Sequence, residues 1–189
     1  MTATKPHLPY TYGDYRTLPE DMSRRYELVH GDLYRVPAPT TRHQRILSTL
    51  NSLVLRQAKN RQLGEVFFAP VDVILGHGDA REVVQPDLVF VAANRRDIVK
   101  LHGIEGPPDL VVEILSPGTE ERDRGYKLKM YARHGVREYW IVDPDPRTID
   151  VYRAGAADYL APVRYRETDV MTGALLRELT IPLHEVFAD

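Results

Sequence analysis

The first residue that could do chemistry is Glu113, because it lies in the middle of an otherwise apolar segment. Residues 108–117 read PDLVVEILSP, with Val112 and Ile114 on either side of the glutamate, and this pattern predicts a buried β-strand. An unpaired ionised carboxylate in an apolar environment is destabilising by several kcal/mol, or else it stays protonated. We therefore expect Glu113 either to contact a cation or to lie at the edge of a sheet.

A second acidic residue, Asp87, begins another apolar segment with the tripeptide PDL, which occurs at residues 86–88 and 108–110. Asp109 shares the strand parity of Glu113, but four residues at about 3.3 Å each place these two carboxylates roughly 13 Å apart. One metal ion cannot bridge that span, because its carboxylate oxygens lie at about 2.0–2.6 Å. If the two apolar strands are neighbours, about 4.8 Å apart, Asp87 and Glu113 can converge on one side. Such a pair has the chemistry of a Mg²⁺ site, whose ion keeps several waters and can bind a phosphate oxygen.

A candidate cation follows in residues 116–135, which predict a helix that opens with a capping pattern and closes at Gly135. Lys127 shares one helix face with these residues: Asp123, Met130, Tyr131 and His134. If that face packs on the sheet, Lys127 points back towards the strand of Glu113, whereas Lys129, about 200° away around the axis, faces solvent. A lysine beside a metal ion can orient the attacking water and stabilise charge on the phosphoryl group.

Elements earlier in the chain must help to position these residues. We expect a short helix after Thr11 and a β-hairpin over residues 25–37 that contains Glu27. A long amphipathic helix should begin at Thr40 or Thr41, either of which can cap it.

The remaining segments predict an α/β fold. Residues 64–76 predict a strand bent at Pro70, and the order strand–helix–strand over residues 109–143 has the form of a βαβ crossover. We therefore predict a single domain over residues 1–189, loose over its first ten or so residues, with a mixed central β-sheet flanked by helices.

Composition restricts the possible function classes. The chain has 189 residues, no cysteine, a net charge of −2 and a pI of about 6.4. The lack of cysteine excludes disulfides and thiolate metal sites and leaves oxygen and imidazole as ligands. Because the charge is nearly neutral, any contact with nucleic acid must rest on a local site. No signal-peptide core is present, and no apolar run approaches the roughly 20 residues that span a bilayer, so we expect a cytoplasmic protein without a membrane partner.

Each candidate site residue also has a structural interpretation. Asp87 could be a turn residue after proline, and Glu113 could form a structural ion pair with an arginine. Lys127 could pair with Asp123 on an exposed helix face, an interaction of about 0.3–0.5 kcal/mol. Glu27 could be a solvated hairpin residue.

Other polar and aromatic residues predict structural roles. His43 is in phase with Leu47 on the long helix, which favours a core or capping role over a catalytic one. His134 lies at a helix C-terminus, where positive charge is favourable, and Tyr139 and Trp140 are predicted core residues. The basic residues near the second helix are interleaved with acids and predict a solvated face, one side of which could meet a phosphate backbone: Arg122, Arg124, Lys127, Lys129, Arg133 and Arg137.

Three segments resemble a known family: QPDLVFV at residues 85–91, YELVHGDL at residues 26–33, and the long run over residues 108–144. They resemble the Uma-type restriction endonuclease family of bacteria, part of the PD-(D/E)XK nuclease superfamily, from about Thr11 to Arg153. The resemblance implies a restriction-endonuclease-like fold and hydrolysis of DNA phosphodiester bonds with Mg²⁺ or Mn²⁺. A homodimer is expected only by analogy, since many nucleases of this fold cut both strands as dimers.

The resemblance also implies roles for individual residues. Asp87 matches the aspartate of the PD motif, and Glu113 matches the acidic residue of the second motif. The chain departs from the superfamily pattern at Leu115, where the pattern has lysine, and Lys127 occupies that role from the following helix. Glu27 resembles an N-terminal glutamate that some of these nucleases use as a further metal ligand.

The working hypothesis is a metal-dependent endonuclease acting on DNA, in which Asp87 and Glu113 hold the metal ion, helped by Glu27 and the carbonyl of Ile114. Lys127 then positions the attacking water or stabilises the pentavalent state, and in-line attack leaves a 5′-phosphate and a 3′-hydroxyl. The alternative is a non-catalytic module that keeps the fold and binds nucleic acid or a partner protein. The near-neutral charge and the lack of an obvious DNA-reading helix favour this alternative slightly, whereas the intact Asp87, Glu113 and Lys127 argue against it.

Overall fold

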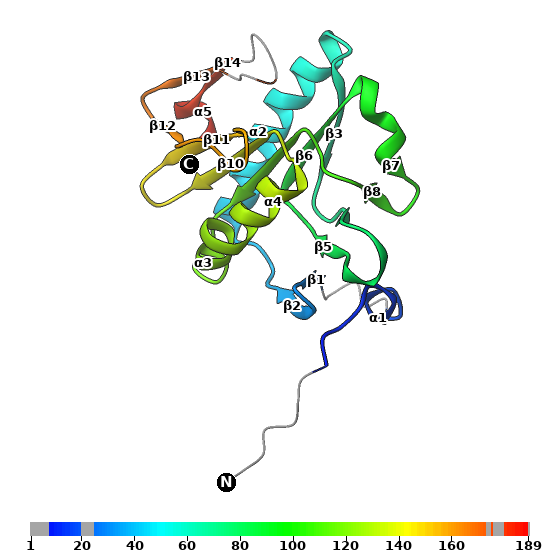
Figure 1. The fold of residues 1–189 in the computed structure, drawn as a ribbon. Coiled ribbons are helices and arrows are strands. Elements are labelled where there is room, and N and C mark those ends of the chain that lie inside the picture. The colour runs from blue at the N-terminus through cyan, green and yellow to red at the C-terminus, as the bar shows by residue number, and fades with distance from the viewer. Residues whose placement is uncertain (1–7, 20–24, 173–174, 176–179, 189) are drawn as a thin grey trace.

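The computed structural model describes residues 8–19, 25–172, 175 and 180–188. Their strands form two six-stranded sheets and one two-stranded sheet (Figure 1). The central sheet has the order β12-β11-β10-β9-β6-β3, with these bounds: β3 Gly64–Phe68, β6 Leu88–Ala92, β9 Leu110–Ile114, β10 Glu138–Asp143, β11 Thr148–Arg153 and β12 Val163–Arg166. The hairpin sheet has the order β2-β1-β5-β4-β8-β7, with these bounds: β1 Arg25–Val29, β2 Asp32–Val36, β4 Val73–Leu75, β5 Glu82–Val84, β7 Val99–Lys100 and β8 Gly103–Glu105. In the small sheet, β13 (Val170–Thr172) pairs with β14 (Thr180–Pro182).

The helices have these bounds: α1 Tyr12–Arg16, α2 Thr41–Asn60, α3 Glu120–Arg122, α4 Leu128–His134 and α5 Leu183–Val186. A π-helical turn, Asp123–Lys127, joins α3 to α4. The predicted start of α2 is confirmed, because the side chain of Thr40 accepts a hydrogen bond of 3.2 Å from the backbone N–H of His43. The predicted end of α4 is confirmed as well, because Gly135 has the left-handed conformation that favours glycine.

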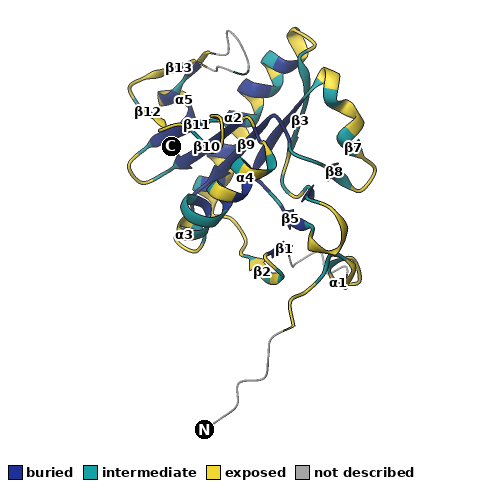
Figure 2. Ribbon diagram, viewed as in Figure 1, coloured by how far each residue is buried: buried dark blue, intermediate teal, exposed yellow. Residues whose placement is uncertain are grey.

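The central sheet is mixed and has helices on both faces. β9 and β10 run parallel and are joined by α3 and α4, which confirms the predicted crossover. α2 packs on one face, where Leu50 lies in the same apolar cluster as Phe90. α4 packs on the opposite face, where Tyr131 lies in the same cluster as Val111. Figure 2 shows the central strands as largely buried, and the predicted mixed sheet flanked by helices is therefore confirmed.

The hairpin sheet differs in part from the expectation. Its β1–β2 hairpin is as predicted, but residues 64–76, expected as one bent strand, form two strands in different sheets. β3 ends before Pro70, which has no N–H to continue the ladder, and β4 begins after it. The sequence did not predict strands β5, β7 and β8. Each has only two or three residues, which are too few to show the alternation of apolar and polar residues that indicates a strand.

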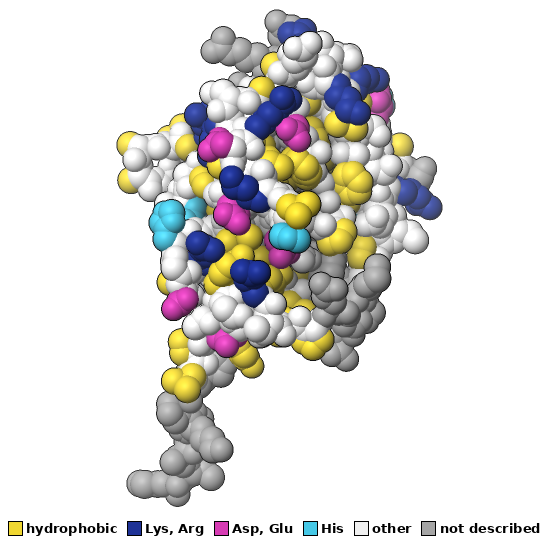
Figure 3. Space-filling view, turned by 90° about the vertical axis from the view of Figure 1, so that its right-hand side faces the viewer, with side chains coloured by type: hydrophobic (Ala, Val, Ile, Leu, Met, Phe, Trp, Pro, Cys, Tyr) yellow, Lys and Arg dark blue, Asp and Glu magenta, His cyan; other side chains and the backbone are white. Residues whose placement is uncertain are grey.

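The surface carries both signs of charge. On the face seen in Figure 3, the right-hand side of Figure 1, Lys and Arg side chains are interspersed with Asp and Glu. Within the described residues, none of the helices has the length and apolar character needed to cross a membrane. Of the N-terminal residues expected to be loose, residues 1–7 lie outside the described part of the chain, and residues 8–10 are exposed without regular secondary structure.

Candidate active site

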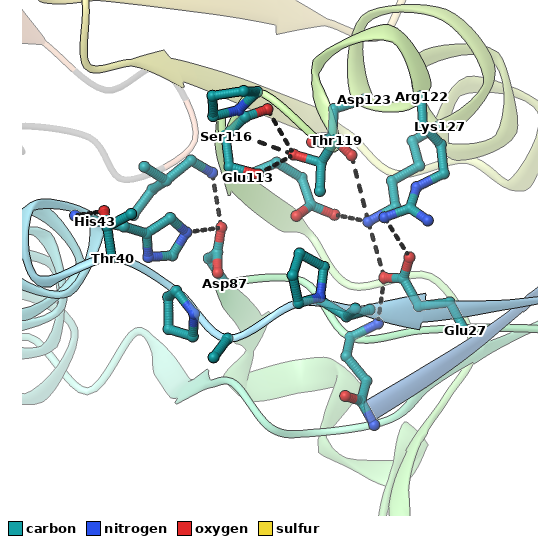
Figure 4. A pocket seen from close by; sticks show the side chains of 18 residues that line it. Glu27, Thr40, His43, Asp87, Glu113, Ser116, Thr119, Arg122, Asp123 and Lys127 are labelled. Atoms are coloured by element: carbon teal, nitrogen blue, oxygen red, sulfur yellow. Dashed lines mark hydrogen bonds and ion pairs between the residues drawn. The ribbon is translucent and has the colours of Figure 1, made fainter. Parts of the chain in front are cut away.

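The pairing of β6 with β9 brings Asp87 and Glu113 together. Leu88 lies opposite Val112 in this antiparallel pair, so Asp87, one residue earlier, faces Glu113, one residue later, on the same side of the sheet. The Oδ2 atom of Asp87 accepts a hydrogen bond of 2.8 Å from the backbone N–H of Ile114. Both carboxylates are buried and face one cavity (Figure 4). The two acids converge as the strand pairing predicts, and their role in metal binding stays a prediction.

Lys127 is the cation that neutralises Glu113. Its Nζ atom lies 2.8 Å from Glu113 Oε1, 2.8 Å from Glu27 Oε1 and 3.5 Å from Asp123 Oδ1. The hydroxyl of Tyr131 donates a further hydrogen bond of 2.9 Å to Glu113 Oε1. Lys127 is buried, so the interpretation of an exposed pair with Asp123 is wrong, and the partner of Glu113 is a lysine rather than an arginine.

The π-helical turn contributes to this placement of Lys127. It spans Asp123–Lys127, and both end residues are buried while the exposed Lys129 lies just beyond it in α4. A π turn widens the helix by one residue and occurs frequently at functional sites. Lys127 and Asp123 both face the sheet, on the side of the helix that the helical spacing predicts.

Glu27 enters the site from β1 of the hairpin sheet. It is buried, so its interpretation as a solvated residue is wrong. Its Oε1 atom accepts a hydrogen bond of 3.0 Å from the backbone N–H of Gln85 and lies 2.8 Å from Lys127 Nζ. Its Oε2 atom lies 3.1 Å from Nη2 of Arg122. Two cations thus hold Glu27, and its expected role as a metal ligand stays a prediction.

His43 belongs to the site although its helical phase favours a core role. It lies in the first turn of α2, is buried, and places Nε2 3.1 Å from Asp87 Oδ2. Its Nδ1 atom is buried without a hydrogen-bond partner among the described residues. Sequence spacing could not find this contact, because 44 positions separate the two residues and only the packing of α2 beside β6 joins them.

Burial and charge shift the acid–base properties of the cluster. Burial raises the pKa of Glu113 to about 8, against the lowering effect of Lys127, and neighbouring carboxylates such as Asp87 add to the rise. Burial also acts to raise the pKa of Glu27, but the cations of Lys127 and Arg122 outweigh it and hold that pKa below its ordinary value. Burial acts to lower the pKa of Lys127, but the surrounding carboxylates raise it, so the ammonium stays protonated.

A cavity of about 340 Å³ opens at these side chains (Figure 4). Residues 36–40, which lead into α2, line one part of it, and residues 116–119, which lead into α3, line another. The ionisable lining consists of His43, four carboxylates and two cations: Glu27, Asp87, Glu113 and Asp123 with Arg122 and Lys127. When all carboxylates are ionised, negative charge exceeds positive charge, which favours the entry of a cation.

The donor set fits a hard divalent ion bound by two carboxylates. Over the described part of the chain, no group of three or more His, Asp or Glu side chains is placed so that it could hold a metal ion. Mg²⁺ does not need such a group, because it is usually bound through one or two carboxylates, waters and substrate phosphates. Asp87 Oδ1 and Glu113 Oε2 are the oxygens that would hold it, since the described residues give neither a hydrogen-bond partner.

Comparisons with known proteins give the family and the fold of the chain. The model of the Uma2 family, described as "Putative restriction endonuclease", matches residues 12–184. A protein of Synechocystis sp. (strain PCC 6803), named "Uncharacterized protein slr1290", is 28% identical over 156 residues and matches 80% of each chain.

A solved structure shares the fold. The crystal structure of "a putative nuclease belonging to DUF820" from Anabaena variabilis superposes with a TM-score of 0.78 at 22% sequence identity, covering 95% of this chain and 98% of that one. Since the family model spans nearly all of the described residues, the chain belongs to the Uma2 family of restriction-endonuclease-like proteins.

Proposed function

We propose that this protein is a Mg²⁺- or Mn²⁺-dependent endonuclease that hydrolyses phosphodiester bonds of DNA. Membership of the Uma2 family supports a nuclease function in general. The observation that carries the finer proposal is the convergence of two buried carboxylates, Asp87 and Glu113, on one sheet face beside Lys127. These three residues come from two strands and a helix, and all three line the same cavity.

Asp87 and Glu113 hold the divalent ion in this proposal, with the carbonyl of Ile114 as a further ligand. The ion, when bound, lowers the pKa of a water and polarises the phosphate. His43 and the backbone N–H of Ile114 both contact Asp87 Oδ2, which leaves Oδ1 directed to the ion. Glu113 uses Oε1 for Lys127 and keeps Oε2 for the ion.

Lys127 stabilises the negative charge that develops on the phosphoryl group through its own positive charge and without a direct contact, since carboxylates take up its N–H donors. Glu27 also holds the ammonium in place, with its Oε1 atom 2.8 Å from Nζ (Figure 4). Both oxygens of Glu27 face cations, so its contacts support the anchoring of Lys127 more directly than a role as a third metal ligand. In-line attack would leave a 5′-phosphate and a 3′-hydroxyl.

Plasmid cleavage with Mg²⁺ or Mn²⁺ tests the proposal. Wild-type protein should nick or linearise the plasmid, Glu113→Ala should not, and Glu121→Gln should cleave as wild type does. Glu121 is the matched control because it is an exposed acid on the same helical segment. Equal cleavage by wild type and Glu113→Ala, or none by either across metals and substrates, contradicts the proposal.

One observation favours a second candidate, a non-catalytic module that binds nucleic acid or a protein. Lys127 lies 2.8 Å from both Glu27 and Glu113, as the cation of a structural cluster would. Calorimetry separates the two functions. The enzyme should bind millimolar Mn²⁺ in a way that Asp87→Ala abolishes, whereas a binding module should show no such difference.

A further inference from the structure

We propose that Arg122 binds a phosphate group of the substrate at the mouth of the cavity, with Tyr34 holding its guanidinium in place. The inference rests on the proposed function, since it names the cation that contacts the nucleic acid. It assigns substrate binding to a residue that belongs to neither the acid pair nor Lys127.

Lys127 is not available for substrate binding. Three carboxylates surround its Nζ atom, at 2.8, 2.8 and 3.5 Å, and its side chain is only 3% exposed. An ammonium has three N–H donors, so these contacts leave none for a phosphate oxygen. A phosphate that approached Lys127 would have to displace a buried carboxylate.

Arg122 has donors to spare. Its guanidinium carries five N–H bonds, and within the described part of the chain it forms one ion pair, from Nη2 to Glu27 Oε2 at 3.1 Å. Its Nε atom is buried without a hydrogen-bond partner among the described residues. The side chain is 16% exposed, lines the cavity, and lies beside Lys127 in Figure 4. Arg122 and Lys127 are the Arg and Lys residues among the described residues that line the cavity. The N–H donors of Lys127 are taken, so Arg122 is the one of the two with free donors.

Tyr34 orients the guanidinium from the β2 strand. The Cζ atom of Arg122 lies 5.3 Å from the centroid of the Tyr34 ring, within the range of a cation–π contact. Such a contact holds the positive charge over the ring and takes up no hydrogen-bond acceptor, so N–H groups stay available for the bidentate bonds that arginine makes to phosphate. Tyr34 is 39% exposed, and the chain that follows it, residues 36–40, lines the cavity.

The charge of the cavity favours such a contact for an anionic substrate. Four carboxylates line the cavity, and a divalent ion between Asp87 and Glu113 compensates only part of their charge. A phosphodiester brings a further negative charge into the same space. Arg122 offers both the positive charge and the geometry that a phosphate needs.

The test measures DNA binding by wild type, Arg122→Gln and the matched control Lys129→Gln, which removes an exposed cation on the far side of the same helical segment. The probe is a short DNA duplex with Ca²⁺ in place of Mg²⁺, titrated over a series of salt concentrations. Arg122→Gln should weaken binding and reduce the slope of log K against log salt by about 0.9, the value for one lost phosphate contact. Lys129→Gln should leave the slope unchanged.

A methylphosphonate linkage, which is a neutral analogue of a phosphate, identifies the phosphate that Arg122 contacts. A single methylphosphonate is moved across the cleavage site of the duplex, and at one position it should weaken binding by wild type but not by Arg122→Gln. Arg122→Lys guards against a folding defect, because it keeps the charge beside Glu27. It should retain the salt slope while kcat/KM falls, since lysine cannot bind phosphate in a bidentate manner.

The outcomes distinguish the two proposals. If wild type cleaves DNA but Arg122→Gln keeps both the salt slope and the methylphosphonate effect, the assignment of Arg122 is wrong and the proposed function stands. If wild type binds DNA through Arg122 without cleavage under any metal, the assignment stands and the endonuclease proposal is wrong. If wild type binds no DNA, both are wrong.

Discussion

Asp87 and Asp109 occupy the same position in the tripeptide PDL, and each precedes a strand of the central sheet, yet their surroundings differ. Asp109 is fully buried, and its Oδ1 atom lies 3.0 Å from Arg95 and 3.3 Å from Arg137. Its Oδ2 atom accepts a hydrogen bond of 2.8 Å from the backbone N–H of Ala92. Asp87 instead contacts one backbone N–H and His43, and no Lys or Arg among the described residues pairs with it.

The difference follows from strand direction. β6 and β9 are antiparallel, so the residues that precede them lie at opposite ends of the strand pair. Only Asp87 shares its end with Glu113, Lys127 and the cavity. A carboxylate whose charge is fully compensated serves the structure, whereas one that is only partly compensated can still take a metal ion. The predictions below test this division between the two aspartates, from the largest expected effect to the smallest.

Asp87→Asn should abolish both plasmid cleavage and Mn²⁺ binding. The amide keeps an acceptor for the N–H of Ile114 but removes the negative charge that the metal ion needs. Asp109→Asn, the matched change, should retain cleavage and instead destabilise the fold by about 1–3 kcal/mol, the cost of impairing a buried hydrogen-bonded group. Cleavage assays and urea unfolding measure the two effects. Full cleavage by Asp87→Asn, with none by folded Asp109→Asn, reverses the assignment.

Lys127→Ala should lower the free energy of unfolding by about 3–5 kcal/mol, because it removes the cation beside the buried Glu113 and one of the two cations beside Glu27. Lys129→Ala should change it by no more than about 0.5 kcal/mol, as expected for an exposed residue. Urea unfolding of both variants without added metal measures the difference. Similar midpoints for the two variants would show that Lys127 does not neutralise the cluster.

His43→Ala should weaken Mn²⁺ binding by about 10–100-fold, the usual effect of removing a group that orients a metal ligand. The substitution removes the contact of 3.1 Å to Asp87 Oδ2 and leaves the carboxylate to rotate. His43→Gln should recover part of the affinity, since the amide N–H can reach the same oxygen. Calorimetry measures the affinities; a purely structural histidine would leave them unchanged in folded protein.

The stability of the metal-free protein should fall gradually as pH rises from 4.5 to about 8 because of Glu113. In this window the folded state keeps the proton of Glu113, whose pKa burial raises, while the unfolded chain has lost it. The folded state therefore binds more protons, and raising the pH favours unfolding. Glu113→Gln should flatten this part of the profile in urea unfolding. If the stability of Glu113→Gln falls with pH as steeply as that of wild type, the raised pKa of Glu113 is contradicted.

Much of the central sheet was accessible from local patterns. The apolar stripe of α2, its cap at Thr40, the strands β6 and β9 and the helical segment between β9 and β10 all follow from periodicity and capping. Strands β5, β7 and β8 and the division of residues 64–76 between two sheets did not follow. These short segments form only because a neighbouring strand supplies their hydrogen bonds, and that neighbour lies elsewhere in the sequence.

The candidate site divides in the same way. The amino-acid sequence by itself determined that Asp87 and Glu113 could meet across neighbouring strands and that Lys127 shares the inward helix face, since strand and helix periods set side-chain direction. Only the tertiary structure decided that Glu27, 100 positions from Lys127, anchors it, that His43 contacts Asp87 and that Arg122 lies over the ring of Tyr34. Periodicity specifies which way a side chain points along its own element, but the packing of sheet against sheet and helix against sheet decides which other charge it meets there.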